Sequence, residues 1–177
     1  VDPGHPTSNS WTQKVDIGLT GFFKGVGFSI GAKGYLGSGS EFWEYNPSNN
    51  SWSQKANYPG VSCRQAVGFS IADKGYVGTG FNSLTSASAN DFWQYDPVLN
   101  IWTQKADFGG TARCGAVAFV IKNRGYVGTG EWKENDFWEY NPSNDSWTRK
   151  ADFSGEERTE AVAFSIGNKG YISTGRD

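Results

Sequence analysis

The chain of 177 residues contains no methionine, one histidine and two cysteines, and these scarcities exclude several kinds of site. The single histidine, His5, lies in a Gly-His-Pro segment that is typical of a turn. No Ser-His-Asp or Cys-His catalytic arrangement can be assembled around it. Two cysteines without a histidine or carboxylate cluster beside them cannot form a tetrahedral metal site. We therefore predict no catalytic residue, no metal and no other cofactor in this chain.

Charge and hydropathy exclude two further classes of partner. Lysine and arginine number 16 against 18 aspartates and glutamates, which gives a net charge of -2. A protein that binds nucleic acid normally carries a basic excess or patch, so nucleic acid is not expected as a partner. The sequence has no apolar run of about 18 residues, so no membrane span is predicted. No signal peptide is recognisable either.

One sequence pattern recurs along the whole chain. Aligning Trp11, Trp52, Trp102 and Trp147 in one column matches twenty residues of every unit without a gap. Successive tryptophans lie 41, 50 and 45 residues apart. A period in this range is typical of a solenoid, an array or the blades of a propeller. We therefore treat residues 1–177 as a single repeat domain.

Each unit contains four short runs that favour β-strands. They are an apolar run such as residues 161–166, a glycine-rich run such as 124–130, a Phe-Trp-x-Tyr run and a run that begins with the aligned tryptophan. The apolar runs are nearly continuous, so we expect them to be buried on both faces, as an innermost strand would be. Asn-Pro-Ser-Asn segments between the runs indicate tight hairpins.

The spacing of tyrosine and tryptophan resembles a known repeat. Tyrosine is followed seven residues later by tryptophan at Tyr45, Tyr95 and Tyr140, downstream of glycine-rich runs, which resembles the kelch motif. The usual pair of adjacent glycines appears here as Gly-x-Gly, and the last unit keeps only Gly175. The variant is similar to kelch-type repeats of secreted and surface proteins in bacteria. The resemblance implies an all-β fold, a β-propeller of four-stranded antiparallel blades, and a secreted or cell-surface location.

The two ends of the chain both fall inside a repeat unit. Trp11 belongs to the last run of a unit, whereas Gly175 closes the second run of another, so the first and last blades are incomplete and would partly complete each other. Three accounts remain open at this stage. The chain is a segment of a larger propeller, or it completes a ring by associating with copies of itself, or it forms a four-bladed ring alone.

Length variation is confined to one loop of each unit. Two residues follow Gly39 before Phe-Trp, eleven follow Gly80 and six follow Gly130. In the kelch-type strand order this loop shares a face with the loop that enters the next blade's first strand, and variable loops on a rigid scaffold often carry binding. The predicted binding residues on this face are Phe22, Phe23, Lys24, Arg64, Phe81, Arg113, Trp132, Lys133, Glu157 and Arg158.

These residue types suit a protein or glycan partner. Arginine offers forked donors to carboxylates or phosphates, and exposed aromatic rings offer flat apolar area. The competing interpretation is that they pair with one another, as Arg158 would with Glu157 or Glu160. We predict a non-catalytic binding or scaffolding module. The alternative is a fragment of a larger carbohydrate-active enzyme, similar to sialic-acid epimerases, or of an oxidase, with its catalytic residues elsewhere.

The two cysteines occupy adjacent alignment columns in neighbouring units. Cys63 and Cys114 lie where the chain approaches the apolar run. A disulfide between them and two buried free thiols are both compatible with this placement.

Overall fold

The structure, a computed structural model, describes residues 10–18, 24–131 and 134–176, and all their regular structure is β-strand. Accordingly, this described part of the chain offers no helix that is long and apolar enough to cross a membrane. Three antiparallel sheets contain four strands each, and two further pairs of strands stand apart from them. The prediction of an all-β fold built from four-stranded antiparallel sheets is confirmed.

The three sheets repeat one strand order, interrupted only by an inserted hairpin in the second. The first sheet contains β1 (Val26–Ile30), β2 (Lys33–Ser38), β3 (Glu41–Asn46) and β4 (Ser51–Gln54). The second contains β5 (Val67–Ile71), β6 (Lys74–Gly78), β9 (Phe92–Asp96) and β10 (Ile101–Gln104). The third contains β11 (Val117–Ile121), β12 (Arg124–Gly128), β13 (Phe137–Asn141) and β14 (Ser146–Arg149). The remaining pairs are β15 (Val162–Ile166) with β16 (Lys169–Ser173), and β7 (Phe81–Asn82) with β8 (Ala87–Ser88).

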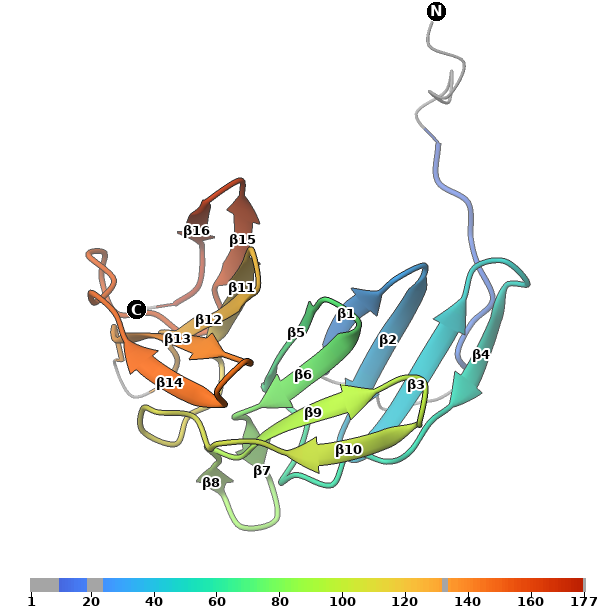
Figure 1. Cartoon of the computed structure of the whole chain (residues 1–177), viewed down its shortest axis with the longest axis horizontal. Helices are drawn as coiled ribbons and strands as arrows, with labels where there is room; N and C mark the ends of the chain where they lie inside the picture. The colour runs from blue at the N-terminus through green and yellow to red at the C-terminus, as the bar shows by residue number, and fades with distance from the viewer. Residues whose placement is uncertain (1–9, 19–23, 132–133, 177) are drawn as a thin grey trace, which may run out of the picture.

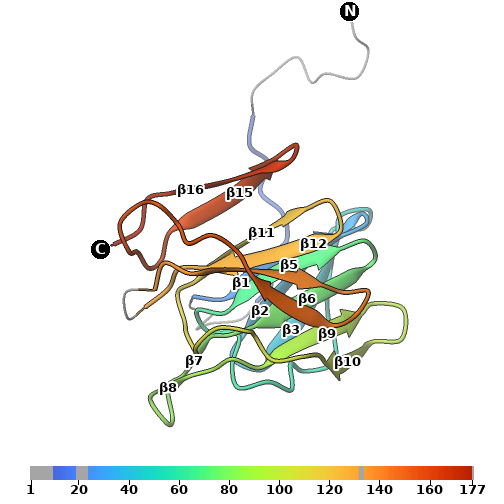
Figure 2. The same cartoon turned by 60° about the vertical axis from the view of Figure 1, so that its left-hand side comes forward.

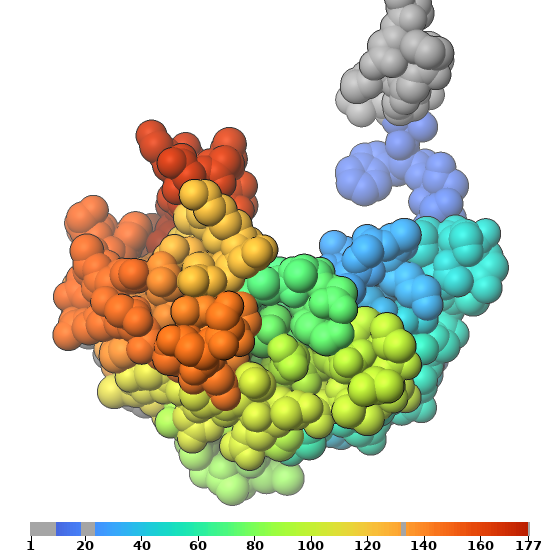
Figure 3. All heavy atoms as spheres, in the orientation of Figure 1, coloured from blue at the N-terminus to red at the C-terminus, as the bar shows by residue number. Residues whose placement is uncertain are grey.

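The sheets stand side by side and meet through their first strands. β1 packs beside β5, β5 beside β11, and β11 beside β15 (Figures 1 and 2). The first sheet and the β15–β16 hairpin stand apart at the open side of this arrangement (Figure 3). The described residues therefore form an open arc and not the closed four-bladed ring that was one of the three accounts. Trp11 is fully exposed, and no described residue of 10–18 pairs with β15 or β16.

The repeated tyrosine and tryptophan are cross-strand neighbours. Tyr45 lies opposite Trp52, Tyr95 opposite Trp102, and Tyr140 opposite Trp147. Their ring centroids are 5.0, 4.9 and 5.0 Å apart. Because a tight turn joins the third and fourth strands, a spacing of seven residues brings the two rings together, and such aromatic pairs stabilise a sheet. This geometry explains why the two residues recur together.

A turn residue and the tryptophan clamp each sheet to the preceding unit. Asn100 has a left-handed φ of 55°, and its Oδ1 accepts hydrogen bonds from Tyr95 Oη at 2.8 Å and from the Ala56 amide at 2.9 Å. The Trp102 indole donates to the Ala56 carbonyl at 2.9 Å. We call this set the turn clamp. The equivalent clamps are Asn50 and Trp52 on Val15, and Asp145 and Trp147 on Ala106.

Aromatic rings fill the space between neighbouring sheets. Phe42 of β3 meets Tyr95 at 4.8 Å and Trp102 at 4.9 Å, both edge-on. Phe92 makes the same contacts to Tyr140 at 4.8 Å and to Trp147 at 5.0 Å. Edge-to-face rings at this separation stabilise beyond the area that they bury. The core thus lies between sheets and repeats with the sequence.

Burial of the first strands depends on their neighbours: β5 and β11 have no exposed residue, whereas the expectation of burial on both faces is wrong for β1 and β15. In β1 the side chains of Val26 and Ile30 are buried, whereas Gly27 and Ser29 are exposed. The small residues on this face have a packing reason. A Cβ added to Gly68 of β5 would lie 2.9 Å from Cβ of Val26 in the neighbouring strand. First strands therefore approach too closely for larger side chains, and Gly68 and Ser70 are half-buried in β5 because β1 covers that face.

Glu44 is a buried acid whose ionisation should control acid stability. It is only 5% exposed and accepts hydrogen bonds from Tyr35 at 2.6 Å and from Lys33 at 2.7 Å, with Lys55 at 3.3 Å. Burial by itself would raise the pKa of Glu44, but the bonds from Lys33 and Tyr35 and the charge of Lys55 together hold it below its ordinary value. We expect this contribution to the unfolding free energy to be complete above about pH 4.3, the ordinary glutamate pKa, and to be lost as pH falls further.

The substitution Glu44→Gln tests this contribution with a residue that the fold already accepts. Gln94 holds the corresponding place in β9, where its amide lies 2.6 Å from the Tyr76 hydroxyl. Urea denaturation from pH 3 to pH 7 should show the wild type more stable than Glu44→Gln at neutral pH and the difference shrinking in acid. A difference that stays constant across this range would contradict the assigned role.

The Trp43 indole is a buried donor without a hydrogen-bond partner among the described residues. In the other sheets the equivalent donors, Trp93 and Trp138, reach the aspartate two residues earlier at 2.8 and 2.6 Å. The first sheet has Glu41 there, one methylene longer. We expect Glu41→Asp to raise the unfolding free energy by about 1 kcal/mol, because an unpaired buried donor is costly. Chemical denaturation measures this, and an unchanged or lower midpoint would contradict it.

Candidate axial binding site

One alignment column converges at the centre of the arc. Lys24, Gln65, Gly115 and Glu160 each lie thirteen residues after an aligned tryptophan and just before a first strand. All four have a left-handed backbone, with φ of 52°, 53°, 66° and 53°. For residues other than glycine this conformation is uncommon. The column therefore has one backbone geometry and four different side chains.

Backbone hydrogen bonds join this column in series. The Gln65 amide donates to the Lys24 carbonyl at 2.7 Å, the Gly115 amide to the Gln65 carbonyl at 3.0 Å, and the Glu160 amide to the Gly115 carbonyl at 3.0 Å. Each unit thus fixes the position of the next. The left-handed backbone is held by these bonds and not by the identity of the side chain.

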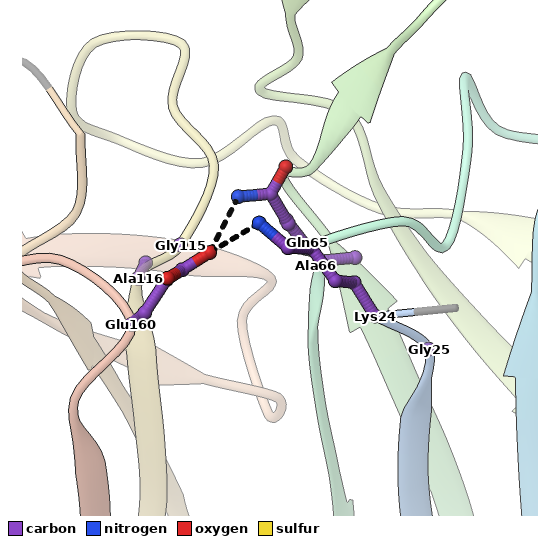
Figure 4. A pocket seen from close by; sticks show the side chains of 7 residues that line it. All are labelled: Lys24, Gly25, Gln65, Ala66, Gly115, Ala116 and Glu160. Atoms are coloured by element: carbon purple, nitrogen blue, oxygen red, sulfur yellow. Dashed lines mark hydrogen bonds and ion pairs between the residues drawn. The ribbon is translucent and has the colours of Figure 1, made fainter. Parts of the chain in front are cut away.

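The side chains of the column meet across a pocket of about 330 Å³. Its walls are Lys24, Gly25, Gln65, Ala66, Gly115, Ala116 and Glu160, and we call it the axial pocket. Figure 4 shows Lys24 and Gln65 pointing from one side toward Glu160 on the other. Gly115 contributes no side chain, which leaves room between them. The volume lies at the lower end of the range for small-molecule sites.

The charges in the axial pocket are paired across it. The Lys24 ammonium donates to Glu160, Gln65 Nε2 lies 3.4 Å from Glu160 Oε1, and Arg176 lies 2.7 Å from Glu160 Oε2. The hydrogen bond from Lys24, with the charges of Lys24 and Arg176, holds the pKa of Glu160 below its ordinary value. Glu160 is therefore a carboxylate at neutral pH and offers an acceptor beside a donating ammonium.

A second layer of polar groups extends the pocket toward the variable loops. Gln65 Nε2 donates to Glu131 Oε1 at 3.1 Å, and the Cys114 thiol donates to Glu131 Oε2 at 3.0 Å. Burial, followed by the hydrogen bond to Glu131, raises the pKa of Cys114 to about 11. Cys114 is thus a neutral thiol at physiological pH. Cys63 is likewise free and buried, so the structure has two buried free thiols and no disulfide.

Variable and entering loops share this face, as the sequence predicted. The Phe81 amide donates to the Arg64 carbonyl at 2.8 Å, and the Arg113 amide to the Ala89 carbonyl at 3.0 Å. The Glu131 amide, in the loop after β12, donates to the Cys114 carbonyl at 2.9 Å. These bonds attach the two sets of loops to each other at the pocket end of the sheets.

No protein-family model matches this sequence, and no curated protein matches it. A solved structure of YjhT has a similar fold. It superposes with a TM-score of 0.82 at 14% sequence identity. The match covers 94% of this chain and 63% of the YjhT chain, so this chain spans less than two thirds of that structure. At this identity the likeness shows the fold alone.

The predicted binding residues are dispersed more widely than expected. Lys24 lies in the axial pocket, whereas Arg64, Phe81 and Glu157 are half-buried in the loops around it. Four of the ten predicted residues fall outside the described part of the chain: Phe22, Phe23, Trp132 and Lys133. The prediction omitted Gln65 and Gly115 and considered Glu160 as a partner of Arg158, although the aligned tryptophans place all three in the same column as Lys24.

Arg113 does not face the pocket, in contrast to its predicted role as a binding residue. Its side chain is 0% exposed and contacts the Asp136 carboxylate at 2.5 and 3.2 Å. It also donates to the carbonyls of Thr111 and Thr129, both at 3.1 Å, and its guanidinium lies 4.8 Å from the Phe108 ring centroid. Arg113 therefore cross-links the entering loop to the loop before β13 and stabilises the scaffold.

Arg158 makes most of the same contacts in the next unit. It donates to the carbonyls of Glu156 at 3.1 Å and Thr174 at 3.0 Å and lies 5.1 Å from the Phe153 ring centroid. Glu157, proposed as a pairing partner, forms no salt bridge with it within the described residues. Arg158 thus occupies a scaffold position like that of Arg113, but it is only half-buried.

A second pocket, of about 450 Å³, lies at the opposite ends of the first two sheets. Its walls include Ile30, Tyr35, Glu44, Pro97 and Val98. Although it is larger, its Glu44 is only 5% exposed and bonded to Tyr35 and Lys33, whereas the Glu160 side chain of the axial pocket is 31% exposed. Glu44 therefore serves the fold, and the axial pocket, whose acid is accessible, is the better candidate for binding.

Proposed function

We propose that the chain is part of a β-propeller with kelch-type blades. In this proposal the three four-stranded sheets are complete blades and the β15–β16 hairpin is the inner half of a fourth. Two features support it: the sheets pack side by side through their first strands, and the Tyr-Trp pairs repeat in register. The secreted or surface location implied by the kelch resemblance belongs to the same proposal.

We further propose that the chain is a non-catalytic binding module that recognises a protein or glycan partner at the axial pocket and the loops around it. The observation that carries this proposal is the column of Lys24, Gln65, Gly115 and Glu160. A column whose role is purely structural repeats one chemistry, as the turn clamp does with the accepting side-chain oxygens of Asn50, Asn100 and Asp145. The axial column instead keeps its backbone and changes its side chain in every unit.

The chemistry of the pocket suits a partner with both donors and acceptors. A carboxylate, an amide and an ammonium point into one space, and the gap at Gly115 leaves backbone within reach. Hydroxyl groups of a sugar or polar side chains of a protein loop would satisfy such a set, whereas a purely apolar ligand would remove water from these polar groups without replacing its hydrogen bonds. The net charge of -2 gives no attraction for nucleic acid.

Titration of the isotope-labelled chain tests this proposal. The probes are a neutral disaccharide, a hexuronic acid, an acidic tetrapeptide and a basic tetrapeptide, each followed through the amide NMR signals. At least one probe should shift the amides of Gln65, Gly115 and Glu160, and Gln65→Ala should weaken its binding by about tenfold. Ser48→Ala, in the exposed turn after β3, is the control and should leave binding unchanged.

Two results would speak against a non-catalytic axial site. Shifts that cluster around Pro97 and Val98 would place binding in the second pocket. A probe sugar whose own spectrum changes over hours in the presence of the chain would favour the enzymatic alternative that the sequence left open.

A further inference from the structure

The second sheet has an apolar turn where the other two complete sheets have a polar one. Its turn between β9 and β10 contains Val98, Leu99 and Ile101, which are 83%, 64% and 47% exposed. The aligned residues are polar in the other sheets: Ser48, Asn49 and Ser51 in the first, and Ser143, Asn144 and Ser146 in the third. Single exposed apolar side chains are ordinary on a protein surface, but a group of them in one turn indicates a contact surface.

This turn borders the second pocket, which is a groove between the first and second sheets. The first-sheet wall of the groove carries Gly31, Ala32 and Lys33, and the second-sheet wall carries Ala72, Asp73 and Val98. Gly31, Ala32 and Ala72 are exposed, as Val98 is. The groove and the apolar turn therefore form one continuous apolar surface with charged groups beside it.

The equivalent place between the second and third sheets is polar. There Asp73 aligns with Ala32, Lys122 with Ala72, and Ser143 with Val98. Both places lie between complete four-stranded sheets, so the two are directly comparable. The apolar character thus belongs to this one groove and not to the repeat.

Hydrogen bonds hold the apolar turn in one conformation. Asp96 Oδ1 accepts from the Val98 amide at 2.9 Å and from the Leu99 amide at 3.2 Å. Asn100, the next residue, belongs to the turn clamp. Because the backbone is already ordered, a contact made by these side chains loses little conformational entropy.

Charge is divided unequally between the two walls. On the first-sheet wall Glu44 pairs with Lys33 at 2.7 Å and with Lys55 at 3.3 Å, which leaves one positive charge in excess. On the second-sheet wall Lys74 pairs with Asp73 at 2.8 Å and with the aspartate of the apolar turn at 3.3 Å, which leaves one negative charge in excess. The groove is therefore apolar along its length, positive on one side and negative on the other.

A surface of this kind is complementary to its own copy. A two-fold axis parallel to the groove places the first-sheet wall of one chain against the second-sheet wall of another. Val98 and Leu99 of each chain then face the small residues Gly31 and Ala32 of the other, and the positive wall faces the negative wall. Such an isologous contact closes at two chains.

We propose that the groove between the first and second sheets is the interface of a homodimer, in which Val98 and Leu99 of each chain pack on Gly31 and Ala32 of the other. The groove lies at the opposite end of the sheets from the axial pocket, so the dimer leaves both axial pockets open. The dimer thus presents two binding sites, which favours a partner with repeated epitopes. This last consequence rests on the binding function proposed above, whereas the dimer itself does not.

Sedimentation equilibrium of the intact chain over a concentration series tests the proposal. The wild type should show a monomer–dimer equilibrium. The double variant Val98→Ser/Leu99→Asn gives the second sheet the turn of the third and should weaken dimerisation at least about tenfold. Adding Ser143→Val/Asn144→Leu to this variant moves the apolar pair to the third sheet and should not restore the dimer. All four side chains are exposed, so both variants should melt within a few degrees of the wild type.

The charge complementarity is tested with Asp73→Lys. Asp73 is 74% exposed, and the substitution brings a lysine to the positive wall of the other chain. We expect dimerisation to weaken about tenfold at low ionic strength and less at high ionic strength, where the repulsion is screened. Asn123→Lys, at the aligned exposed position of the third sheet, is the matched control and should leave the dimer unchanged.

Three outcomes would overturn the proposal. A chain that remains monomeric up to millimolar concentration would show that the groove does not bind its own copy. A dimer of unchanged affinity in Val98→Ser/Leu99→Asn would place the interface elsewhere, such as at a strand edge. Association that continues beyond two chains would contradict an isologous contact.

Discussion

Trp102→Ala should lower the unfolding free energy by about 3 to 5 kcal/mol, the range for deleting a large aromatic side chain from a core. The indole lies between two sheets, with ring centroids of Phe42 at 4.9 Å, Tyr58 at 5.2 Å and Tyr95 at 4.9 Å. The substitution removes all three contacts and also the hydrogen bond to the Ala56 carbonyl. Equilibrium denaturation in urea, with a common slope for variant and wild type, measures the loss.

Trp11→Ala is the matched control, because Trp11 occupies the same alignment column. Its side chain is 104% exposed, so its removal should change the unfolding free energy by no more than about 0.5 kcal/mol. If the two variants lost similar unfolding free energy, the aligned tryptophans would stabilise the chain by something other than packing between sheets. A loss below about 1 kcal/mol for Trp102→Ala would contradict its place in the core.

Arg113→Ala should be as costly, at about 3 to 5 kcal/mol, because it leaves the Asp136 carboxylate without its cation in a buried setting. Burial alone would raise the pKa of Asp136, but the hydrogen bonds from Arg113 and Trp138 hold it below its ordinary value. In the variant we expect this pKa to rise. The stability loss should therefore be largest near neutral pH and smaller in acid, where the carboxylate of the variant is protonated.

Arg158→Ala separates this effect from the loss of an arginine in general. Arg158 makes the equivalent contacts to carbonyls and to a ring but has no carboxylate among the described residues. Its removal should cost about 1 kcal/mol or less. If both arginine variants lose the same free energy, the pair with Asp136 does not carry the effect.

The strand content and register follow from the repeated columns. Tyr45 and Trp52 are seven residues apart with an Asn-Pro turn between them, and such local spacing determines a hairpin wherever it occurs. Because each unit repeats this pattern, residues in the same alignment column occupy equivalent places in successive sheets. The surface expected for the loops followed from their length variation together with the strand order implied by the kelch resemblance, and the hydrogen bonds between those loops show that they share one face.

What the sequence concealed depends on contacts between units. Arg113 and Arg158 occupy one column, so sequence alone treats them alike. Burial differs because Asp136 and its strand cover Arg113. The axial column was overlooked for a different reason: its members share a backbone conformation and no side-chain chemistry. A search for similar residues passes over them, whereas a search for columns of constant position and changing type would find them.

The turn clamp has a thermodynamic consequence. Since Asn100 and Trp102 hold the backbone of the preceding unit at Ala56, each unit is completed by its successor. The unfolding free energy of each unit then depends on its nearest neighbours, and no single folding nucleus serves the whole domain. Hydrogen exchange should accordingly be slowest in the second sheet, which has a four-stranded sheet on either side, and fastest in the β15–β16 hairpin, which can open without disturbing the sheets before it.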